Sequence, residues 1–347
     1  GSRWMSSENE LTKRMSKCNE RLQLLTITVA ALLSPASGLV LNRNASGVNT
    51  TLSLCSSFSN PDMPPSFCYA SPWMQELHQV DPAPNKVFVD VGCNTGVSAA
   101  KWLDVWEMSG LVERWRLALL GKVGPGACWQ NKVQNIAYAS NFHRPSSTRA
   151  KALCIEAMSS SVQLLHLTNT LVLGTSSPIE VIHAAASDRE GRIFFPDNAA
   201  GEERRGINNF MQKETESSFI TMTTVDKLVA SRGISRVDVL TVDTEGHDPA
   251  VLRGAKQTLL NTRFLQFEVH EDFSATEWGK TTLLNVLNEL SSASFDCYWP
   301  SNSGGLYKLT GCWTSVHQVQ HQPIGWSNVV CAKRGDKWNA VLAKHAT

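Results

Sequence analysis

The stretch Lys86-Val-Phe-Val-Asp-Val-Gly-Cys-Asn-Thr-Gly96 decides the fold of this chain. It opens with a continuous apolar run, which is typical of a strand buried on both faces of a parallel sheet. Gly92 and Gly96 then allow a sharp bend, because a residue without a Cβ accepts backbone conformations that other residues avoid. Apolar residues recur at helical spacing from Val97 to Trp106. These features predict a strand, a glycine loop and a helix.

Strand and helix patterns continue to alternate after this unit. Further strands are predicted at residues 151–156, 179–186, 236–243 and 263–270, with an antiparallel extension at 192–195. Helices are predicted at residues 160–168, 224–230, 249–260 and 280–290. This order indicates an α/β fold of the Rossmann-like type, with a doubly wound, mostly parallel sheet and helices on both faces.

The chain divides into four predicted parts. Residues 1–41 form a basic and apolar N-terminal segment, and residues 42–84 a linker rich in Ser, Asn and Pro. The core is predicted at residues 85–272 and carries an insertion at about 108–149, which we interpret as a lid or a substrate-contacting piece. Residues 273–347 are an aromatic-rich extension, which fits antiparallel strands at one sheet edge or a wall of a substrate site.

Composition limits the classes of partner. Lys and Arg total 32 against 31 Asp and Glu, so the formal net charge is only +1. Nucleic-acid-binding domains usually carry a clustered basic face, so no nucleic acid is expected as a partner. The balance fits a small or neutral substrate.

The nine cysteines contain no Cys-x-x-Cys pair, which argues against a zinc site. Cys93 and Cys154 fall inside predicted core elements and are expected to be buried small hydrophobic residues. Cys55 with Cys68, and Cys297 with Cys312 or Cys331, could pair in an oxidising compartment.

The N-terminal segment bears on localisation. Basic residues precede an apolar stretch at residues 22–41, which fits a signal peptide or a signal anchor that holds the chain in a membrane. Asn44 and Asn49 begin two glycosylation sequons on the side that would face the lumen. We therefore expect a location in the secretory pathway, either in the ER or Golgi lumen, where a signal anchor would make the chain a single-pass type II membrane protein, or outside the cell after secretion. A cytosolic N-terminal helix is the alternative.

The glycine loop itself favours one class of cofactor. A dinucleotide loop would read Gly-x-Gly-x-x-Gly, whereas this one is Gly-x-x-x-Gly with Asp90 two residues before it. An acid suits the ammonium group of S-adenosylmethionine, met directly or through water, better than the pyrophosphate of NAD. Glu156 ends the second strand, where an acid commonly binds a ribose diol.

A second block gives a family resemblance. The segment Val237-Asp-Val-Leu-Thr-Val-Asp-Thr-Glu-Gly-His-Asp-Pro-Ala-Val-Leu-Arg-Gly-Ala255 resembles the one by which FkbM-type methyltransferases are known. Blocks at residues 88–96, 154–157, 184–191 and 267–270 match the family's other motifs in order. The resemblance covers about residues 86–271 and leaves out both ends and the insertion.

The resemblance implies roles for particular residues. Four would surround the methionine part of S-adenosylmethionine, namely Asp90, Gly92, Asn94 and Gly96. Glu156 would bind the ribose, Ser187 and Asp188 the adenine edge, and Asp243 would face the methyl group. The chain departs from the family in having Asp248 where a Glu is usual, with a proline after it, and the shorter acid could reposition a substrate contact.

A hydroxyl acceptor needs a group to take its proton. The candidates at the ends of neighbouring strands are Asp243, Glu245, His247, Glu268 and His270, and we favour Asp243 and His247 over His270. No metal is predicted, although a divalent cation held by Asp243, Glu245 and Glu268 is an alternative.

The sequence thus predicts an S-adenosylmethionine-dependent O-methyltransferase that acts on a hydroxyl of a sugar, a glycolipid or another small metabolite. The alternatives are an NAD-binding Rossmann oxidoreductase and a non-catalytic binding protein with a methyltransferase fold. An RNA methyltransferase is disfavoured by the charge. The acceptor and the oligomeric state are not determined by the sequence.

Overall fold

The computed structural model describes residues 71–106, 110–123, 149–195, 197–202, 219–270, 276–301, 304–313 and 326–346. The predicted membrane segment at residues 22–41, both sequons, and the Cys55 and Cys68 pair lie outside these residues. Within the described ranges, no helix has both the length and the apolar character needed to cross a bilayer.

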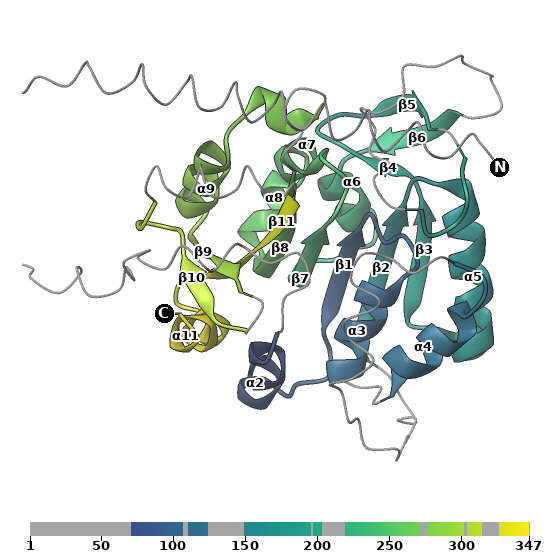
Figure 1. Cartoon of the computed structure of the whole chain (residues 1–347), viewed down its shortest axis with the longest axis horizontal. Helices are drawn as coiled ribbons and strands as arrows, with labels where there is room; N and C mark the ends of the chain where they lie inside the picture. Colours follow the sequence, from purple (N-terminus) through teal and green to yellow (C-terminus); the bar gives the residue numbers. More distant parts are fainter. Residues whose placement is uncertain are drawn as a thin grey trace, which may run out of the picture. The chain divides into compact units, whose positions relative to one another are not determined.

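The core is one eight-stranded sheet (Figure 1). Its strands are β1 (Val87–Val91), β2 (Lys151–Glu156), β3 (Ile179–His183), β7 (Val237–Val242), β8 (Thr262–His270), β9 (Phe295–Pro300), β10 (Leu306–Lys308) and β11 (Trp326–Lys333). The order is β10-β9-β11-β8-β7-β1-β2-β3. Strands β3, β2, β1, β7 and β8 run parallel, as predicted. The C-terminal strands pair antiparallel, which confirms the expected closure of one sheet edge.

Helices cover both faces of the sheet (Figure 1). One face carries α2 (Trp73–Val80), α3 (Val97–Trp106), α4 (Leu111–Leu119), α5 (Ser159–Leu173) and α11 (Lys337–Lys344). The other carries α6 (Val225–Ala230), α7 (Asp248–Arg253), α8 (Lys256–Leu260) and α9 (Leu283–Ser292). Successive residues of β1 point to opposite faces, so that Phe88 enters the first core cluster and Val89 the second. This two-sided burial explains why β1 reads as a continuous apolar run.

A second sheet contains three short strands in the order β4-β6-β5. They are β4 (Ala185–Ala186), β5 (Gly191–Phe194) and β6 (Phe219–Thr223). The predicted strand at residues 179–186 is therefore divided between two sheets, because Ala184 donates its N–H to Glu156 O while Ala185 pairs with Met222. The predicted antiparallel extension is β5, and its partner β6 was not predicted.

The structure differs from two expectations at the start of the core, within the residues that it describes. The predicted linker at residues 42–84 includes α2, in which Trp73, Met74 and Leu77 are buried. The predicted lid at residues 108–149 begins with α4, a core helix whose Trp115 is fully buried and donates from its indole to Thr95 O. Its remaining residues, 124–148, lie outside the described part of the chain.

The predicted helix at residues 249–260 is instead the pair α7 and α8, which separate at Gly254 and Ala255. A Cβ on Gly254 would lie 1.9 Å from the carbonyl oxygen of Ser187. The backbone that follows α7 therefore packs directly on the turn after β4. A short 3-10 helix, η4 (Glu277–Lys280), lies beside α7.

Candidate functional site

The site lies where the strand order reverses, at the carboxyl ends of β1 and β7. Open α/β sheets bind ligands at this position, because the two following loops leave the sheet in different directions. Here the loops nevertheless touch at their start. Asp243 donates its N–H to Val91 O at 2.9 Å. Gly92 has a φ of +77°, and a Cβ there would lie 1.7 Å from the carbonyl oxygen of Asp243.

The cofactor loop, which we define as residues 92–96, is fastened to the neighbouring strand β2. Gly92 and Cys93 both donate their N–H groups to Ile155 O, at 2.9 and 3.2 Å. Asn94, at a φ of +49°, donates its N–H to the Glu156 carboxylate at 2.7 Å. Three successive N–H groups of the cofactor loop are therefore hydrogen-bonded to β2 before any ligand binds.

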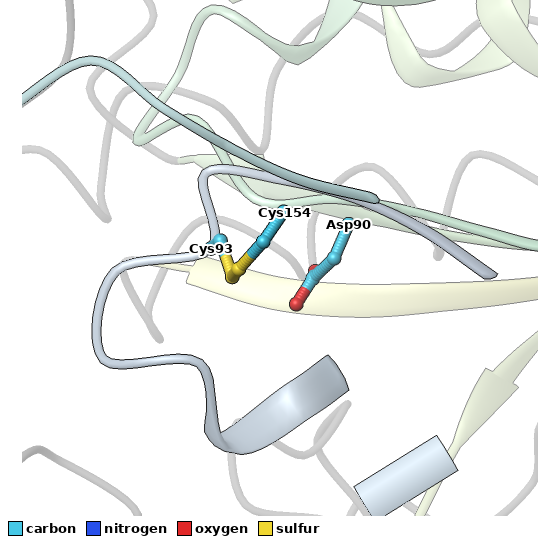
Figure 2. Close-up of side chains that lie close together, drawn as sticks. All are labelled: Asp90, Cys93 and Cys154. Carbon is cyan, nitrogen blue, oxygen red and sulfur yellow. A yellow bond between two sulfur atoms is a disulfide. The ribbon is translucent and has the colours of Figure 1, made fainter. Parts of the chain in front are cut away.

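A disulfide adds a covalent link between the same two elements. Cys93 in the cofactor loop is bonded to Cys154 in β2, with 5.4 Å between their Cα atoms (Figure 2). Both residues are buried, as predicted, but the expectation that they are separate small hydrophobic residues is wrong. Their pairing was missed because burial alone does not show that two side chains meet.

Glu156 is the acid predicted to bind a ribose. It is buried, and its second carboxylate oxygen accepts from the Met158 N–H at 2.8 Å. Burial raises its pKa, while the bonds from Met158 and Asn94 lower it by less. A carboxylate has about four acceptor positions, so each oxygen can still accept a hydroxyl donor.

Asp90 lies beneath the cofactor loop. Its side chain is buried and accepts a hydrogen bond from the Thr241 hydroxyl of β7. Burial raises the pKa of Asp90 to about 6, an effect that Thr241 and the first turn of α3 partly oppose. In this position Asp90 joins β1 to β7 under the loop, and contact with a ligand ammonium stays a prediction.

An acidic cluster occupies the ends of β7 and β8, and it consists of Asp243, Glu245, Asp248, Glu268 and His270. His270 Nε2 lies 2.6 Å from a Glu268 oxygen and 3.3 Å from a Glu245 oxygen. Glu245 has a φ of +54°, an uncommon conformation for a residue with a side chain.

The charges of the acidic cluster shift one another's protonation. Desolvation by the surrounding atoms, followed by the charges of Glu268 and Glu245, raises the pKa of Asp243 well above its usual value, although its side chain remains open to solvent. Burial lowers the pKa of His270, but Glu245 and other carboxylates raise it by more. Four carboxyl groups therefore lie around one histidine, with negative charge in excess.

Asp248 is the buried support of the acidic cluster. Its carboxylate accepts from the Thr244 hydroxyl at 3.1 Å, and from the N–H groups of Gly246 and Glu268 at 3.3 Å each. Burial raises its pKa to about 6. Because Asp248 is closed to solvent, it fixes the turn after β7 against β8, and the expected change in a substrate contact does not apply.

His247 lies in a different group from the acidic cluster. It is buried, and its Nε2 is 3.0 Å from the Ser187 hydroxyl. Burial lowers its pKa to about 4, so the imidazole is neutral near pH 7. The geometry therefore gives His247 a role in holding Ser187, and it does not support our preference for His247 as a base.

The predicted adenine-edge residue Asp188 is anchored by Arg253, which is itself held by Glu277. The sequence analysis singled out neither of these two residues. Arg253 of α7 pairs with Asp188 at 2.8 Å and with Glu277 of η4 at 2.9 Å. These partners lie 65 and 24 positions from Arg253 in sequence, so no local pattern could have indicated them.

Two groups of side chains have the donors for a metal ion among the described residues. Glu245, Glu268 and His270 place one ligand atom each within 4.8 Å of one another, and their oxygen and nitrogen donors suit a divalent cation. The structure thus exchanges Asp243 of the predicted set for His270. Asp90, Cys93 and Cys154 are equally close, but the disulfide removes both thiolates.

Comparisons with known proteins identify the family of the chain. The family profile described as the methyltransferase FkbM domain matches residues 66–297. The 2-O-methyltransferase NoeI of Sinorhizobium fredii is 24% identical over 236 residues, which cover 64% of this chain and 78% of the relative.

Solved structures with some similarity are also methyltransferases. Methyltransferase FkbM from Methylobacillus flagellatus KT has 13% identity and a TM-score of 0.35, over 67% of this chain and 55% of that one. The SAM-dependent methyltransferase from Agrobacterium tumefaciens has 9% identity and a TM-score of 0.32, over 75% of this chain and 60% of that one. The chain spans less than two thirds of the length of either solved protein.

Proposed function

The chain belongs to the FkbM methyltransferase family, and on that premise we propose that it moves a methyl group from S-adenosylmethionine to a hydroxyl of a sugar, a glycolipid or another small molecule. The observation that carries the proposal is the contact between the cofactor loop and the acidic cluster. Gly92 lies directly against the backbone of Asp243, so a cofactor on the loop would place its reactive end beside the cluster.

The residues present fit such a cofactor. Glu156 keeps acceptor positions for the two ribose hydroxyls, and its bond from Asn94 sets its position relative to the cofactor loop. Asp188 would meet the adenine edge, held by Arg253. The bound cofactor supplies a methyl group on a positively charged sulfur. The excess negative charge around Asp243 favours a cation at this place.

Asp243 is the group we assign to the acceptor proton. Its carboxylate is open to solvent, and its raised pKa makes it a better base near neutral pH than an ordinary aspartate. Burial lowers the pKa of His270, but Glu245 and other carboxylates raise it by more, and its Nε2 lies 2.6 Å from a Glu268 oxygen. We therefore assign His270 to balancing the charge of the acidic cluster and not to the base. The hydroxyl proton therefore passes to the Asp243 carboxylate.

A hydroxyl oxygen as acceptor is supported by the relative NoeI, whose name describes a 2-O-methyltransferase. The near-zero net charge of the chain supports an acceptor without strong charge. A glycan or glycolipid satisfies both conditions, and so does a small hydroxylated metabolite.

Binding of S-adenosylhomocysteine, measured by calorimetry, tests the cofactor. We expect the wild type to bind it and Glu156→Gln to bind about tenfold more weakly, since a lost hydrogen bond to a charged group costs about 1.5 kcal/mol or more. Glu190→Gln is the matched control, because Glu190 is an exposed acid outside the candidate site that pairs with Lys227. Tighter binding of NAD than of S-adenosylhomocysteine would favour the oxidoreductase alternative.

Methyl transfer to a panel of sugars, glycolipids and small alcohols, followed with a labelled methyl group, tests the acceptor. We expect a product whose new ether lies on a hydroxyl oxygen and whose formation requires Asp243. Binding without transfer to any member of the panel would favour the non-catalytic alternative.

We also infer that the chain folds in an oxidising compartment, in the secretory pathway or after secretion. Two buried disulfides support this location, since such bonds persist where thiols are not kept reduced. Sensitivity of the expressed chain to an N-glycosidase, lost in an Asn44→Gln/Asn49→Gln variant, would support it. Free thiols at Cys297 and Cys331 in the native protein would contradict it.

A further inference from the structure

We propose that the Cys93–Cys154 disulfide holds the cofactor loop in the conformation that binds the cofactor, so that it controls affinity in addition to stability. The inference rests on the proposed function. It concerns two side chains that take no part in the hydrogen bonds described for the site.

One end of the Cys93–Cys154 disulfide lies within the cofactor loop itself. Cys93 lies between Gly92 and Asn94, whose backbones are both left-handed, at φ values of +77° and +49°. Cys154 lies two residues before Glu156 on β2, where it is paired in register with Asp90 of β1. The disulfide therefore connects the cofactor loop to β2, the strand between β1 and the edge strand β3 (Figure 2).

The conformation of the cofactor loop determines where Glu156 is held. The Asn94 N–H reaches the Glu156 carboxylate, so displacement of residue 94 would also release the predicted ribose ligand. Gly92 and Gly96 increase the number of conformations open to the unbound loop. A covalent link at Cys93 removes many of these conformations and leaves fewer to be lost on binding.

Both sulfur atoms of this disulfide belong to buried residues. Cys93 is 4% exposed and Cys154 is fully buried, so a reductant has no direct access to either sulfur. The Asp90 carboxylate lies within 4.8 Å of both sulfur atoms and is itself buried. The bond is thus a permanent structural link beneath the site, without the exposure that a redox switch needs.

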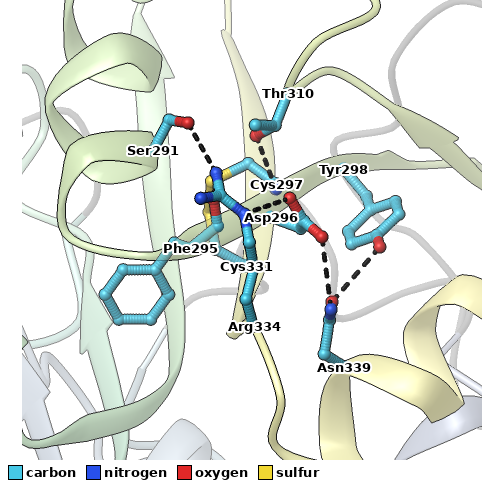
Figure 3. The surroundings of a disulfide bond; sticks show 9 residues. All are labelled: Ser291, Phe295, Asp296, Cys297, Tyr298, Thr310, Cys331, Arg334 and Asn339. Atoms are coloured by element: carbon cyan, nitrogen blue, oxygen red, sulfur yellow. Dashed lines mark hydrogen bonds and ion pairs between the residues drawn. A yellow bond between two sulfur atoms is a disulfide. The ribbon is translucent and has the colours of Figure 1, made fainter. Parts of the chain in front are cut away.

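The chain contains its own control for this proposal. Cys297 and Cys331 form a second buried disulfide, which joins directly opposed positions of β9 and β11. Near it, Arg334 forms an ion pair with Asp296, and the Asn339 side chain donates a hydrogen bond to Asp296 (Figure 3). These three residues do not belong to the candidate site. In the sheet order, β8 and β7 separate this disulfide from β1.

The two disulfides close segments of 61 and 34 residues. The loop-closure entropy grows only slowly with length, so removal of either bond should stabilise the unfolded chain by similar amounts. A difference between the two variants in ligand affinity would therefore come from the native site.

The experiment compares Cys93→Ala/Cys154→Ala with Cys297→Ala/Cys331→Ala. Alanine is preferred to serine, because a hydroxyl at either position would add a donor beside Asp90. For each variant and the wild type, we would measure the thermal midpoint and the dissociation constant of S-adenosylhomocysteine by calorimetry. We expect both variants to melt earlier than the wild type.

Only the Cys93→Ala/Cys154→Ala variant should lose affinity, by about tenfold or more, because small displacements of a positioning loop have effects of this order. Equal affinity in the two variants and the wild type would overturn the proposal. If the wild type itself does not bind the ligand, the proposed function fails instead, so the two failures are distinct.

If the first variant does not fold, the second provides the background for another measurement. Because the sulfurs are closed to a reductant in the folded protein, Cys297→Ala/Cys331→Ala protein would be reduced in a denaturing concentration of urea and then diluted into native buffer, and mass spectrometry would count the free thiols at Cys93 and Cys154. Affinity should then fall in proportion to the reduced fraction. Affinity that is independent of this fraction would contradict the role assigned to the bond.

Discussion

The tight contact between the cofactor loop and β7 can be tested by a single added methyl group, in Gly92→Ala. The new Cβ would lie 1.7 Å from the Asp243 carbonyl oxygen, where an ordinary contact begins at 3.4 Å, so the loop or Asp243 must move by about 1.7 Å. Two hydrogen bonds depend on the present positions, from Gly92 N–H to Ile155 O and from Asp243 N–H to Val91 O.

The expected cost has two parts. A side chain at a left-handed φ costs about 1–2 kcal/mol. Weakening the two hydrogen bonds adds about 1 kcal/mol each, so the free energy of unfolding should fall by about 3–4 kcal/mol. The matched control is Gly233→Ala, because Gly233 has a φ of +62° and nothing within 4 Å of the new Cβ. The control should lose only the first part, about 1–2 kcal/mol.

Urea denaturation would measure both changes, and calorimetry with S-adenosylhomocysteine would report on the site. Gly92→Ala should weaken binding by about a hundredfold, since displacements near 1 Å have effects of that size, while Gly233→Ala should bind like the wild type. Equal stability loss and equal affinity in the two variants would refute the reasoning, because backbone strain alone would then explain both.

Three predictions concern ionisable groups. Asp243→Asn should lower methyl transfer by about 10²–10⁴-fold and leave S-adenosylhomocysteine affinity within about threefold. Because the base must be deprotonated, wild-type kcat/KM should decrease as the pH is lowered through the pKa of Asp243, which lies well above the range of an ordinary aspartate. Burial lowers the pKa of His247 from 6.5 to about 4, so its contribution to stability is complete above pH 6.5 and is lost as the pH falls toward 4. Urea denaturation should show about 2 kcal/mol less stability at about pH 5 than at about pH 7.5, and His247→Gln should abolish this part of the difference. Burial raises the pKa of Asp81, but Arg263 and Lys337 lower it further, to about 2, so the ion pairs stabilise the fold above pH 3.8 and are lost as the pH falls to 2. Asp81→Asn should therefore cost up to about 2 kcal/mol at neutral pH and almost nothing near pH 2, and equal costs at both would contradict this assignment.

The sequence was sufficient for most of the parallel half of the sheet because β1, β2, β7 and β8 are largely buried on both faces. β1 and β7 read as apolar runs that end in Asp90 and Asp243, and the structure places these strands side by side. Helix α2 escaped prediction because it follows a Pro-rich stretch, and its burial depends on partners such as Phe264, almost 200 residues away. A local pattern contains no information on such partners.

The sequence indicated which residues lie at the candidate site, but it did not indicate which of them are in contact. Glu156 and Asn94 were both singled out, but their hydrogen bond depends on the register of β1 and β2. The sequence analysis favoured His247 over His270 as a base, although both lie near the end of a strand. Only the fold separates them, because one is buried against Ser187 and the other lies among carboxylates.

The place of β11 in the sheet has a consequence for synthesis on the ribosome. β11 lies between β8 and β9 and is hydrogen-bonded to both, although it follows both in sequence. Residues 86–270 emerge first and can assemble the cofactor loop and the acidic cluster while β8 is still an edge strand. β9 and β10 pair with each other but not with β8, so they join that sheet only when residues 326–333 emerge. A nascent chain stalled before Trp326 would therefore expose the outer edge of β8, and unpaired edges of this kind promote association with other chains.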